Sequence, residues 1–403
     1  MKNILLITSL YPADDVKFLN NTSVCHYFSK EWVKLGHNVR VIFSYRIYPW
    51  YYYPVIKIMK KRLARTQAAA ILDKRLTSPH HYEMDGVKVC RLPIYKSRPH
   101  GEFDAEEIDK HCEAIHKELL ESCFVPDIIL GHFVNPSLMI VNTMKDYYPQ
   151  AQTVVSMHGQ GLGMGYRLEY DRLFAKLDFI GYRSHSIRKA YESMYGKRPY
   201  LMCPSGVPEE YIVEKPKQFD GGLRNFIYVG SFMDRKHPTT IVEALAKAMG
   251  DKDYCLTFVG DGDGKANIYE TAKRFGNVGK LRFTGRIPRN EVTKELDKAD
   301  VFIMVSENET FGLVYLEAMS RGCITIASRN EGMDGYIRDG ENGFLCKSGD
   351  AEELSEIIKR ICNMHSRRLV SLSEESLATA RSMTDKKVAN DYIKVFENDN
   401  KRV

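Results

Sequence analysis

Short apolar runs alternate with amphipathic stretches along the whole chain. Near the N-terminus, residues 4–8 form an apolar run, residues 24–35 carry apolar side chains at helical spacing, and residues 39–43 form a second run. These features predict a strand, a helix that ends at a left-handed Gly36, and a second strand. A βαβ unit of this kind implies a parallel sheet with right-handed crossovers, so the pattern predicts an α/β protein.

The same pattern occurs in two series, which a polar segment separates. Further strands of the first series are predicted at residues 127–130, 153–156 and 200–203. Residues 204–225 are rich in proline, glycine and charge and predict an interdomain linker. The strands predicted for the second series are residues 226–229, 256–259, 281–284, 301–305 and 324–327.

Each series predicts one doubly wound parallel sheet. We expect a first domain over residues 1–205 and a second over residues 206–383. The last amphipathic stretch, within residues 384–398, completes either the second domain or, as we expect, the first. Sheets of this type bind ligands at the carboxyl ends of their strands. The expected arrangement is therefore two Rossmann-like domains facing a central cleft that contains the active site.

Composition and cysteine usage narrow the class of protein. Of the 403 residues, 44% are hydrophobic and 27% charged, which is the balance of packed domains rather than of a disordered or collagen-like chain. Nine cysteines without a C-x-x-C pair indicate neither a zinc knuckle nor a disulfide framework, and they favour a reducing compartment. The first apolar run is too short for a membrane span and no cleavage site follows it, so we expect a cytoplasmic protein.

The net charge of +6, from 58 basic and 52 acidic residues, lies in one segment. Residues 46–72 contain six basic residues and no acidic residue, so the rest of the chain sums to zero. Aromatic residues beside a basic amphipathic stretch are typical of peripheral docking to an anionic membrane. The expected docking residues are Trp50, Tyr51, Lys57, Lys60, Lys61, Arg62 and Arg65. The alternative is a helix whose aromatic side chains cover an acceptor groove, and a generally basic, nucleic-acid-binding protein is disfavoured.

The clearest sign of chemistry is the segment VFIMVSENETFGLVYLEAMSRG, residues 301–322. It predicts a buried strand, a polar turn and a helix that starts near Gly312, whose N-terminal N–H groups would bind a phosphate. Glu317 lies five residues into that helix, roughly 7.5 Å along its axis, within reach of ribose hydroxyls. Glu309 would face a sugar on the other side of the phosphate. The alternative is a loop carboxylate and a solvated helix residue.

Several motifs occur in the order and spacing of one enzyme family. In the second half they are VGSFMDRKHP (229–238), GDGDG (260–264), FTGRIP (283–288), the F-G dipeptide (311–312), E-A-M-x-x-G (317–322) and RDGENGFL (338–345). Looser matches in the first half are TSLYP (8–12), LGHNVRV (35–41), PDII (126–129), MHG (157–159) and CPSGV (203–207). In these motifs the chain resembles the retaining family 4 glycosyltransferases of the GT-B fold.

The resemblance implies transfer of a sugar, with retention of its anomeric configuration, from a nucleotide sugar to a hydroxyl acceptor. UDP- or GDP-sugars are the expected donors, and a lipid-linked or growing surface glycan at the inner face of the plasma membrane is the expected acceptor. Neither a cofactor nor a metal is implied. The catalytic residues would be Glu309 and His158, which contact the transferred sugar, and Lys236, whose fixed cation would stabilise the leaving diphosphate.

The same motifs imply a set of donor-binding residues, which are Gly230, Ser231, Arg235, Ile287, Phe311, Gly312, Leu313 and Glu317. Backbone groups at 311–313 would line the sugar and diphosphate, Ile287 would pair with the base, and Glu317 would bind the ribose. Ser231 departs from the family, which commonly has arginine there, and Arg235 in the adjacent turn is the candidate to replace it. On the acceptor or phosphate side, the candidates are Asn21 and Thr22, unless this segment only caps a helix.

Two further patterns are assigned no chemistry, and two other functions stay open. Asp261 and Asp263 form a D-x-D in a turn where the fold has a structural loop, so we expect no metal there. The glycine run 159–165 has Met164 where a dinucleotide fingerprint needs glycine. The competing functions are a noncatalytic sugar-nucleotide or glycan-binding subunit of a polysaccharide assembly complex, and an epimerase or phosphorylase of the same fold.

Overall fold

The computed structural model describes residues 1–14, 23–58, 75–99, 102–159 and 167–396, which form two compact units. Unit 1 comprises Met1–Arg183, Ala190–Cys203 and the chain from Ala389 onward, and unit 2 comprises Ser184–Lys189 and Pro204–Val388.

The observed division departs from the expected domain limits in two short pieces. The main division falls between Cys203 and Pro204, next to the expected limit at 205/206, but Ser184–Lys189 belong to unit 2. The reason is local packing, since the ring centroid of His185 lies 5.2 Å from that of Tyr336. The stretch expected at 384–398 is likewise divided, at Ala389.

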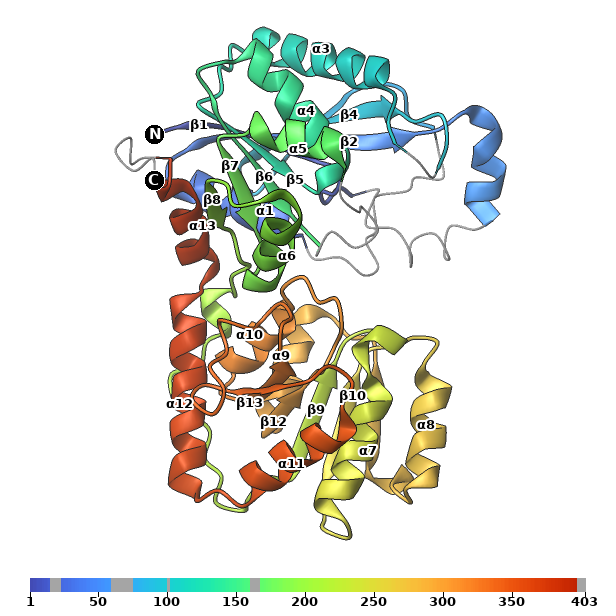
Figure 1. The fold of residues 1–403 in the computed structure, drawn as a ribbon, viewed down its shortest axis with the longest axis vertical. Coiled ribbons are helices and arrows are strands. Elements are labelled where there is room, and N and C mark those ends of the chain that lie inside the picture. The colour runs from blue at the N-terminus through green and yellow to red at the C-terminus, as the bar shows by residue number, and fades with distance from the viewer. Residues whose placement is uncertain (15–22, 59–74, 100–101, 160–166, 397–403) are drawn as a thin grey trace. The chain divides into compact units, whose positions relative to one another are not determined.

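The core of unit 1 is one sheet, whose described strands lie in the order β3-β4-β2-β1-β5-β6-β7-β8 (Figure 1). All neighbours are parallel except the antiparallel pair β3 and β4. Residues 4–7 of β1 are fully buried, as expected for a strand covered on both faces. The strands are β1 (Asn3–Thr8), β2 (Asn38–Ile47), β3 (His80–Met84), β4 (Val87–Tyr95), β5 (Ile128–His132), β6 (Gln152–Met157), β7 (Phe179–Tyr182) and β8 (Tyr200–Met202).

The helices of unit 1 include the end of the chain. They are α1 (Val24–Lys34), the 3-10 turn η1 (Trp50–Tyr52), α3 (Ala105–Glu121), α4 (Val134–Tyr147), α5 (Leu168–Ala175), and the second halves of α6 (His185–Tyr195) and α13 (Asp385–Lys394). Trp32 Nε1 donates a hydrogen bond of 2.9 Å to the carbonyl of Ala389. The ring of Tyr392 lies 5.5 Å from that of Trp32 and 5.3 Å from that of Phe28. Aromatic packing of this kind buries much apolar area, so the second half of α13 is part of the core of unit 1.

Unit 2 has a second sheet, which is parallel throughout and has the described order β11-β10-β9-β12-β13-β14. Its strands are β9 (Asn225–Val229), β10 (Cys255–Val259), β11 (Leu281–Gly285), β12 (Val301–Ile303), β13 (Ile324–Ser328) and β14 (Phe344–Cys346). The strand order reverses between β9 and β12, which is the position where doubly wound sheets bind ligands.

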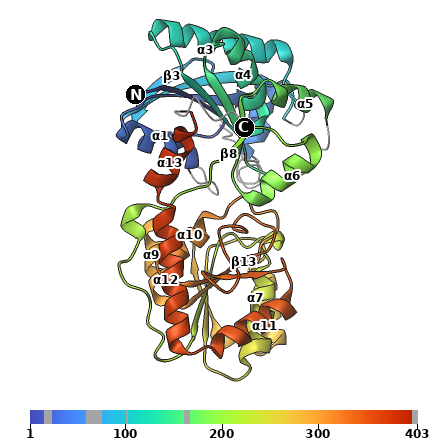
Figure 2. The same ribbon diagram turned by 60° about the vertical axis from the view of Figure 1, so that its left-hand side comes forward.

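The helices of unit 2 form two packed groups. They are α7 (Pro238–Met249), α8 (Lys265–Arg274), α9 (Arg289–Lys298), α10 (Leu313–Ser320), α11 (Ala351–Cys362) and α12 (Ser366–Ser382), with 3-10 turns η2 (Glu209–Tyr211), η3 (Asp234–Lys236) and η4 (Val278–Lys280). Helix α7 packs against α8 and α11, whereas α10 packs against α9 and α12 (Figures 1 and 2). Each group covers one face of the sheet, as in other doubly wound folds.

The predicted class, α/β with two parallel-sheet units, is confirmed. The expectation of a wholly parallel first sheet is wrong at its edge, where β3 and β4 form an antiparallel hairpin. Its turn residues Asp85 and Gly86 have φ of 50° and 78°, the left-handed pair that an Asp-Gly hairpin turn favours. The sequence signal for this hairpin was therefore present. Strands β7 and β14 are also absent from the sequence prediction.

Candidate functional site

The two predicted catalytic residues of unit 2, Lys236 and Glu309, lie where the strand order reverses, at the carboxyl ends of β9 and β12. The turn η3 after β9 carries Lys236, and the loop after β12 carries Glu309. The two segments are joined by a backbone hydrogen bond of 2.7 Å from the N–H of Glu307 to the carbonyl of Arg235. Side chains far apart in the sequence are thereby held in one place.

Lys236 and Glu309 form an ion pair at this position. The distance from Lys236 Nζ to Glu309 Oε2 is 3.3 Å, and only 14% and 13% of the two side chains are exposed. Ser306 Oγ also donates to Glu309 Oε2, at 3.5 Å. Separating the two side chains would leave each charge largely buried without a partner, which is costly. The ion pair therefore holds both side chains in place. A bound diphosphate would offer Lys236 a second anionic partner.

Glu331, in the turn that follows β13, accepts hydrogen bonds from the loop that carries Glu309. The N–H of Glu309 donates to Glu331 Oε2 at 2.7 Å, and the N–H of Asn308 donates to the same carboxylate. Burial raises the pKa of Glu331, and the two backbone donors partly offset that rise. Next to it, a Cβ on Gly332 would lie 2.5 Å from Phe311 Cα. Sequence reasoning missed Glu331, although its place after the next strand of the sheet was a usable signal.

The predicted start of α10 is confirmed at Gly312, which precedes the first helical residue, Leu313. Gly312 has φ of 81°, and a Cβ there would lie 2.4 Å from Tyr315 Cε2 and 3.3 Å from Glu309 Cγ. Only glycine fits both the left-handed backbone and this close approach. The hydroxyl of Tyr315 donates to the carbonyl of Met304 at 2.6 Å, which ties the helix to the end of β12.

Glu317 is buried and paired, so the alternative of a solvated helix residue is wrong. Its side chain is 9% exposed, and Arg289 Nε donates to Glu317 Oε1 at 2.5 Å. Arg289 is the first residue of α9 and follows the loop that contains half-buried Ile287. This ion pair connects the loop expected to contact the base with the helix expected to contact the ribose.

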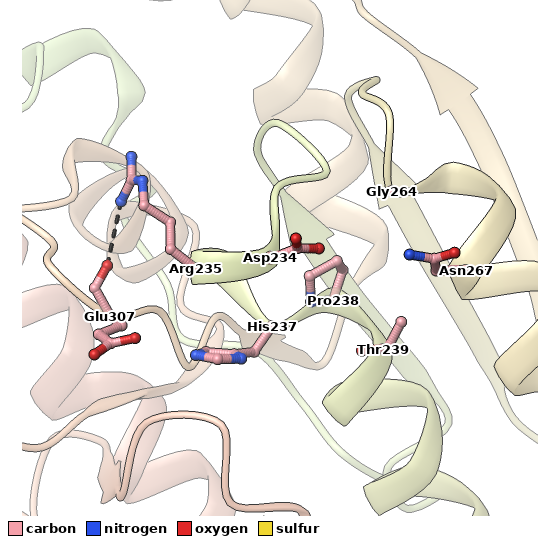
Figure 3. Close-up of a pocket in the computed structure, with 8 residues that line it drawn as sticks. All are labelled: Asp234, Arg235, His237, Pro238, Thr239, Gly264, Asn267 and Glu307. Carbon is pink, nitrogen blue, oxygen red and sulfur yellow. Dashed lines mark hydrogen bonds between the residues drawn. The ribbon is translucent and has the colours of Figure 1, made fainter. Parts of the chain in front are cut away.

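Arg235, the candidate to replace the missing arginine at Ser231, bonds to the backbone of the β12 loop. Its Nη1 donates to the carbonyls of Glu307 and Asn308 at 3.3 and 3.4 Å, and Figure 3 shows the guanidinium reaching that loop. It also lines a cavity of about 350 Å³ together with Asp234, His237, Pro238, Thr239, Gly264, Asn267 and Glu307. Neither Lys236 nor Glu309 lines this cavity.

The glycines of the GDGDG motif have a packing role. A Cβ on Gly260 would lie 1.9 Å from the carbonyl oxygen of Gly230, and one on Gly262 would lie 2.7 Å from the nitrogen of Phe232. Phe232 N–H also donates to the carbonyl of Asp261 at 3.1 Å. The prediction of a structural loop is confirmed, because this loop supports the segment from Gly230 to Lys236.

In unit 1, the predicted His158 follows β6 and contacts a second histidine. His132 Nδ1 and His158 Nε2 are 2.9 Å apart, and the ring of Phe133 stacks on His158 with centroids 4.0 Å apart. His132 is fully buried, within 3.5 Å of Ser156 Oγ and 3.4 Å of the hydroxyl of Tyr392. His132 ends β5 as His158 follows β6, a parallel that sequence reasoning missed.

Both imidazoles are neutral at neutral pH. Burial lowers the pKa of His132 to about 3, and the positive charge of Arg183 adds to the effect. Burial, with His132 and Arg183, holds the pKa of His158 well below its ordinary value. This pair can donate and accept hydrogen bonds but carries no charge.

The expected membrane segment is described only in part. Asn21, Thr22, Lys60, Lys61, Arg62 and Arg65 lie outside the described residues. Within η1, Trp50 is 75% and Tyr51 55% exposed, and Ile58 further along is 85% exposed. Lys57 is exposed as well. Among the helices in the described ranges, none has both the length and the apolar character needed to cross a bilayer.

Comparison with known proteins gives one family-model match, which lies in unit 2, and several partial matches to single proteins. Residues 211–375 match the family model described as glycosyl transferases group 1. The lipopolysaccharide core biosynthesis glycosyltransferase LpsE of Rhizobium meliloti is 34% identical over 37% of this chain and 43% of its own length. N-acetyl-alpha-D-glucosaminyl L-malate synthase of Bacillus anthracis is 32% identical over 32% of this chain. These matches span less than half the length of either relative, 43% and 34%.

Other matches cover nearly the whole chain at lower identity. The putative teichuronic acid biosynthesis glycosyltransferase TuaC of Bacillus subtilis is 24% identical over 89% of this chain and 88% of its own. Among solved structures, sucrose-phosphate synthase from Thermosynechococcus elongatus has a TM-score of 0.69 at 17% identity, covering 98% of both chains. Anabaena HepE in complex with UDP-glucose has a TM-score of 0.65 at 14% identity, covering 98% of this chain and 100% of its own. These likenesses confirm the GT-B fold.

Proposed function

We propose that this chain, whose residues 211–375 match the group 1 glycosyl transferases, transfers a sugar from a nucleotide sugar to a hydroxyl acceptor during polysaccharide assembly. The observation that carries the proposal is the Lys236–Glu309 pair, 3.3 Å apart where the strand order of unit 2 reverses. A cation held at that position beside the N-terminus of α10 suits a diphosphate leaving group.

The proposed donor is a UDP- or GDP-sugar, and the proposed reaction retains the anomeric configuration without a metal. HepE, a structural neighbour, is known in complex with UDP-glucose, which supports a nucleotide sugar. The bond from the anomeric carbon to the diphosphate breaks, and a bond from that carbon to the acceptor oxygen forms on the same face. The acceptor proton passes to the leaving phosphate oxygen. Lys236 stabilises the charge on that phosphate, and Glu309 and neutral His158 hold the sugar.

The proposed acceptor is a lipid-linked or growing glycan, approached at an anionic membrane surface. Support comes from the exposed apolar side chains Trp50, Tyr51 and Ile58, and from the six basic residues without an acid in residues 46–72. LpsE and TuaC are named for lipopolysaccharide core and teichuronic acid biosynthesis, which supports a surface glycan.

Donor use is tested by screening UDP-, GDP- and ADP-sugars for thermal stabilisation of the chain and then for turnover. One donor class should stabilise the wild type and be consumed, with consumption lost in Lys236→Ala and Glu309→Ala. Lys247→Ala is the matched control, because Lys247 pairs with Glu243 on the surface of α7. Binding without any turnover would favour the noncatalytic subunit, and turnover without an acceptor to an isomeric sugar nucleotide would favour an epimerase.

Membrane docking is tested separately, by cosedimentation with vesicles of anionic or of neutral phospholipid. We expect binding to anionic vesicles only, reduced when Lys57, Lys60, Lys61 and Arg62 are neutralised or when Trp50 and Tyr51 become alanine. Neutralising four exposed lysines elsewhere should leave binding unchanged, and Lys117, Lys273, Lys294 and Lys298 serve for this. Equal binding by all variants would contradict the docking proposal and leave the transferase proposal standing.

A further inference from the structure

A cluster of three potential metal ligands lies at the edge of unit 1. None of the three residues has a role in the proposed sugar transfer or in membrane docking. His81 is on the edge strand β3, Cys90 on β4 and Glu118 near the end of α3. His81 and Cys90 are directly opposite each other in the antiparallel pairing of β3 with β4. One ligand atom from each of the three residues lies within 4.8 Å of the others.

The three side chains differ in burial in a way that leaves the cluster accessible. Cys90 is 5% exposed, the Glu118 side chain 14%, and the His81 side chain 59%. His81 Nε2 and Glu118 Oε2 are 2.9 Å apart. The three residues line a pocket of about 270 Å³. An ion could therefore reach the buried thiol from solvent, past the exposed imidazole.

Glu118 presents its two oxygens to different partners. Oε1 lies 3.9 Å from Nη1 of Arg40, whereas Oε2 faces His81. Arg40 thus orients the carboxylate while leaving Oε2 for a ligand beside the imidazole. Support of a coordinating carboxylate by a neighbouring group is a regular feature of metal sites.

We propose that His81, Cys90 and Glu118 bind one zinc ion. An imidazole nitrogen, a thiolate and a carboxylate are the ligands zinc takes in proteins, and three protein ligands leave a fourth position for water. Magnesium and calcium are excluded by the thiol, because they take oxygen ligands. On binding, the Cys90 thiol gives its proton to solvent, so thiolate and carboxylate together balance the charge of Zn²⁺.

The observed geometry needs a small contraction to become tetrahedral. With bonds of roughly 2.0 to 2.3 Å, tetrahedral ligand atoms lie roughly 3.5 Å apart, so the widest separation must close by about 1 Å. His81 can supply part of this adjustment, since its side chain is largely exposed on an edge strand. The bound ion would join β3 to α3 and stabilise this edge of the sheet, because a ligand that binds only the folded state raises its stability.

The test uses the full chain after treatment with a chelator, titrated with Zn²⁺ and, for spectroscopy, with Co²⁺. We expect one tightly bound ion per chain, a rise in melting temperature, and an absorption band from a thiolate bound to cobalt. Cys90→Ser should remove that band. His81→Gln should weaken Zn²⁺ binding by at least about tenfold, since loss of even a supporting partner costs roughly 10–100-fold.

Two matched variants distinguish this cluster from general metal binding by exposed side chains. His80 is the neighbour of His81, and successive side chains of a strand point to opposite faces, so His80→Gln should bind zinc as the wild type does. Cys123 is the exposed free cysteine, and Cys123→Ser should keep the cobalt band.

Three results would overturn the proposal: no stoichiometric ion in the wild type, an unchanged affinity in His81→Gln, or a cobalt band that disappears with Cys123 rather than Cys90. His81→Gln changes an exposed residue, so the folded state is retained even if Cys90→Ser lowers stability.

Discussion

The two units place their candidate chemistry at the same kind of position, at the carboxyl ends of parallel strands, but the groups are charged in one unit and uncharged in the other. In unit 2 the position holds a lysine and a carboxylate, and in unit 1 it holds two neutral histidines, of which His132 is fully buried. The charged pair suits a ligand that is itself charged, such as a diphosphate. The neutral pair suits hydroxyl groups, because it offers hydrogen bonds without a charge that must be compensated. Under the proposed function, this difference favours unit 2 as the unit that binds the anionic part of the donor.

The largest expected effect comes from removing the cation of unit 2. Lys236→Ala should lower kcat by roughly 10²–10³-fold, about 3–4 kcal/mol in the barrier, as loss of a single electrostatic stabiliser does elsewhere. The decrease in kcat is measured by steady-state kinetics with the donor found in the screen. The kcat of Lys247→Ala should stay within threefold of that of the wild type. If the kcat of Lys236→Ala were also within threefold, the cation would have no role in transfer, and the contrast between the two units would be wrong.

The next effect concerns the backbone of unit 2 at Gly312. Gly312→Ala adds a Cβ at φ of 81° and 2.4 Å from Tyr315, so it should lower the free energy of unfolding by about 1–3 kcal/mol. It should also lower kcat, because Glu309 Cγ lies 3.3 Å from the added atom. Urea unfolding followed by circular dichroism measures the first effect. Gly279→Ala is the control, since nothing lies within 4 Å of a Cβ there.

Glu331 tests whether the Glu309 loop needs its support. Glu331→Leu leaves the N–H groups of Glu309 and Asn308 without their acceptor, which should cost roughly 1–3 kcal/mol of stability. Glu331→Gln keeps an acceptor oxygen and should cost less than about 1 kcal/mol. Urea unfolding of both variants, with donor turnover in parallel, provides the comparison. Equal losses for both variants would mean that packing, not hydrogen bonding, holds this loop.

The smallest effect is the pH response of unit 1. The folded pKa of His132 is about 3, below the ordinary value of about 6.5, so its stabilising contribution is present above pH 6.5 and is lost as the pH falls toward 3. A single such group gives a slope approaching about 1.4 kcal/mol per pH unit below its unfolded pKa. Both tryptophans, Trp32 and Trp50, are in unit 1, so tryptophan fluorescence reports its unfolding. His132→Gln should flatten the dependence between pH 6.5 and 5, and an unchanged slope would contradict the neutral pair.

The sequence predicts more of the structure and candidate site of unit 2 than of unit 1, for a physical reason. The start of α10 at Gly312, the buried strands and the clustering of Lys236 with Glu309 depend on local patterns and on where strands end. Glu331 and His132 act through contacts with residues 22 and 26 positions away, and a single sequence does not show such contacts directly.

The proposed zinc ligands illustrate the same limit. His81 and Cys90 meet only because an Asp-Gly turn sets the register of β3 against β4, and Glu118 joins them from a helix. No short spacing motif connects these three residues, so the sequence alone does not indicate that they form a cluster. Register and helix packing, rather than composition, bring these side chains together.

Calorimetric titration can establish whether Lys236 recognises the diphosphate of the donor, as we claim. The nucleoside diphosphate that binds most tightly is compared with its parent nucleoside, for the wild type and for Lys236→Ala. We predict that the wild type prefers the diphosphate and that Lys236→Ala loses most of that preference while its affinity for the nucleoside stays the same. An undiminished preference for the diphosphate in Lys236→Ala would contradict the claim.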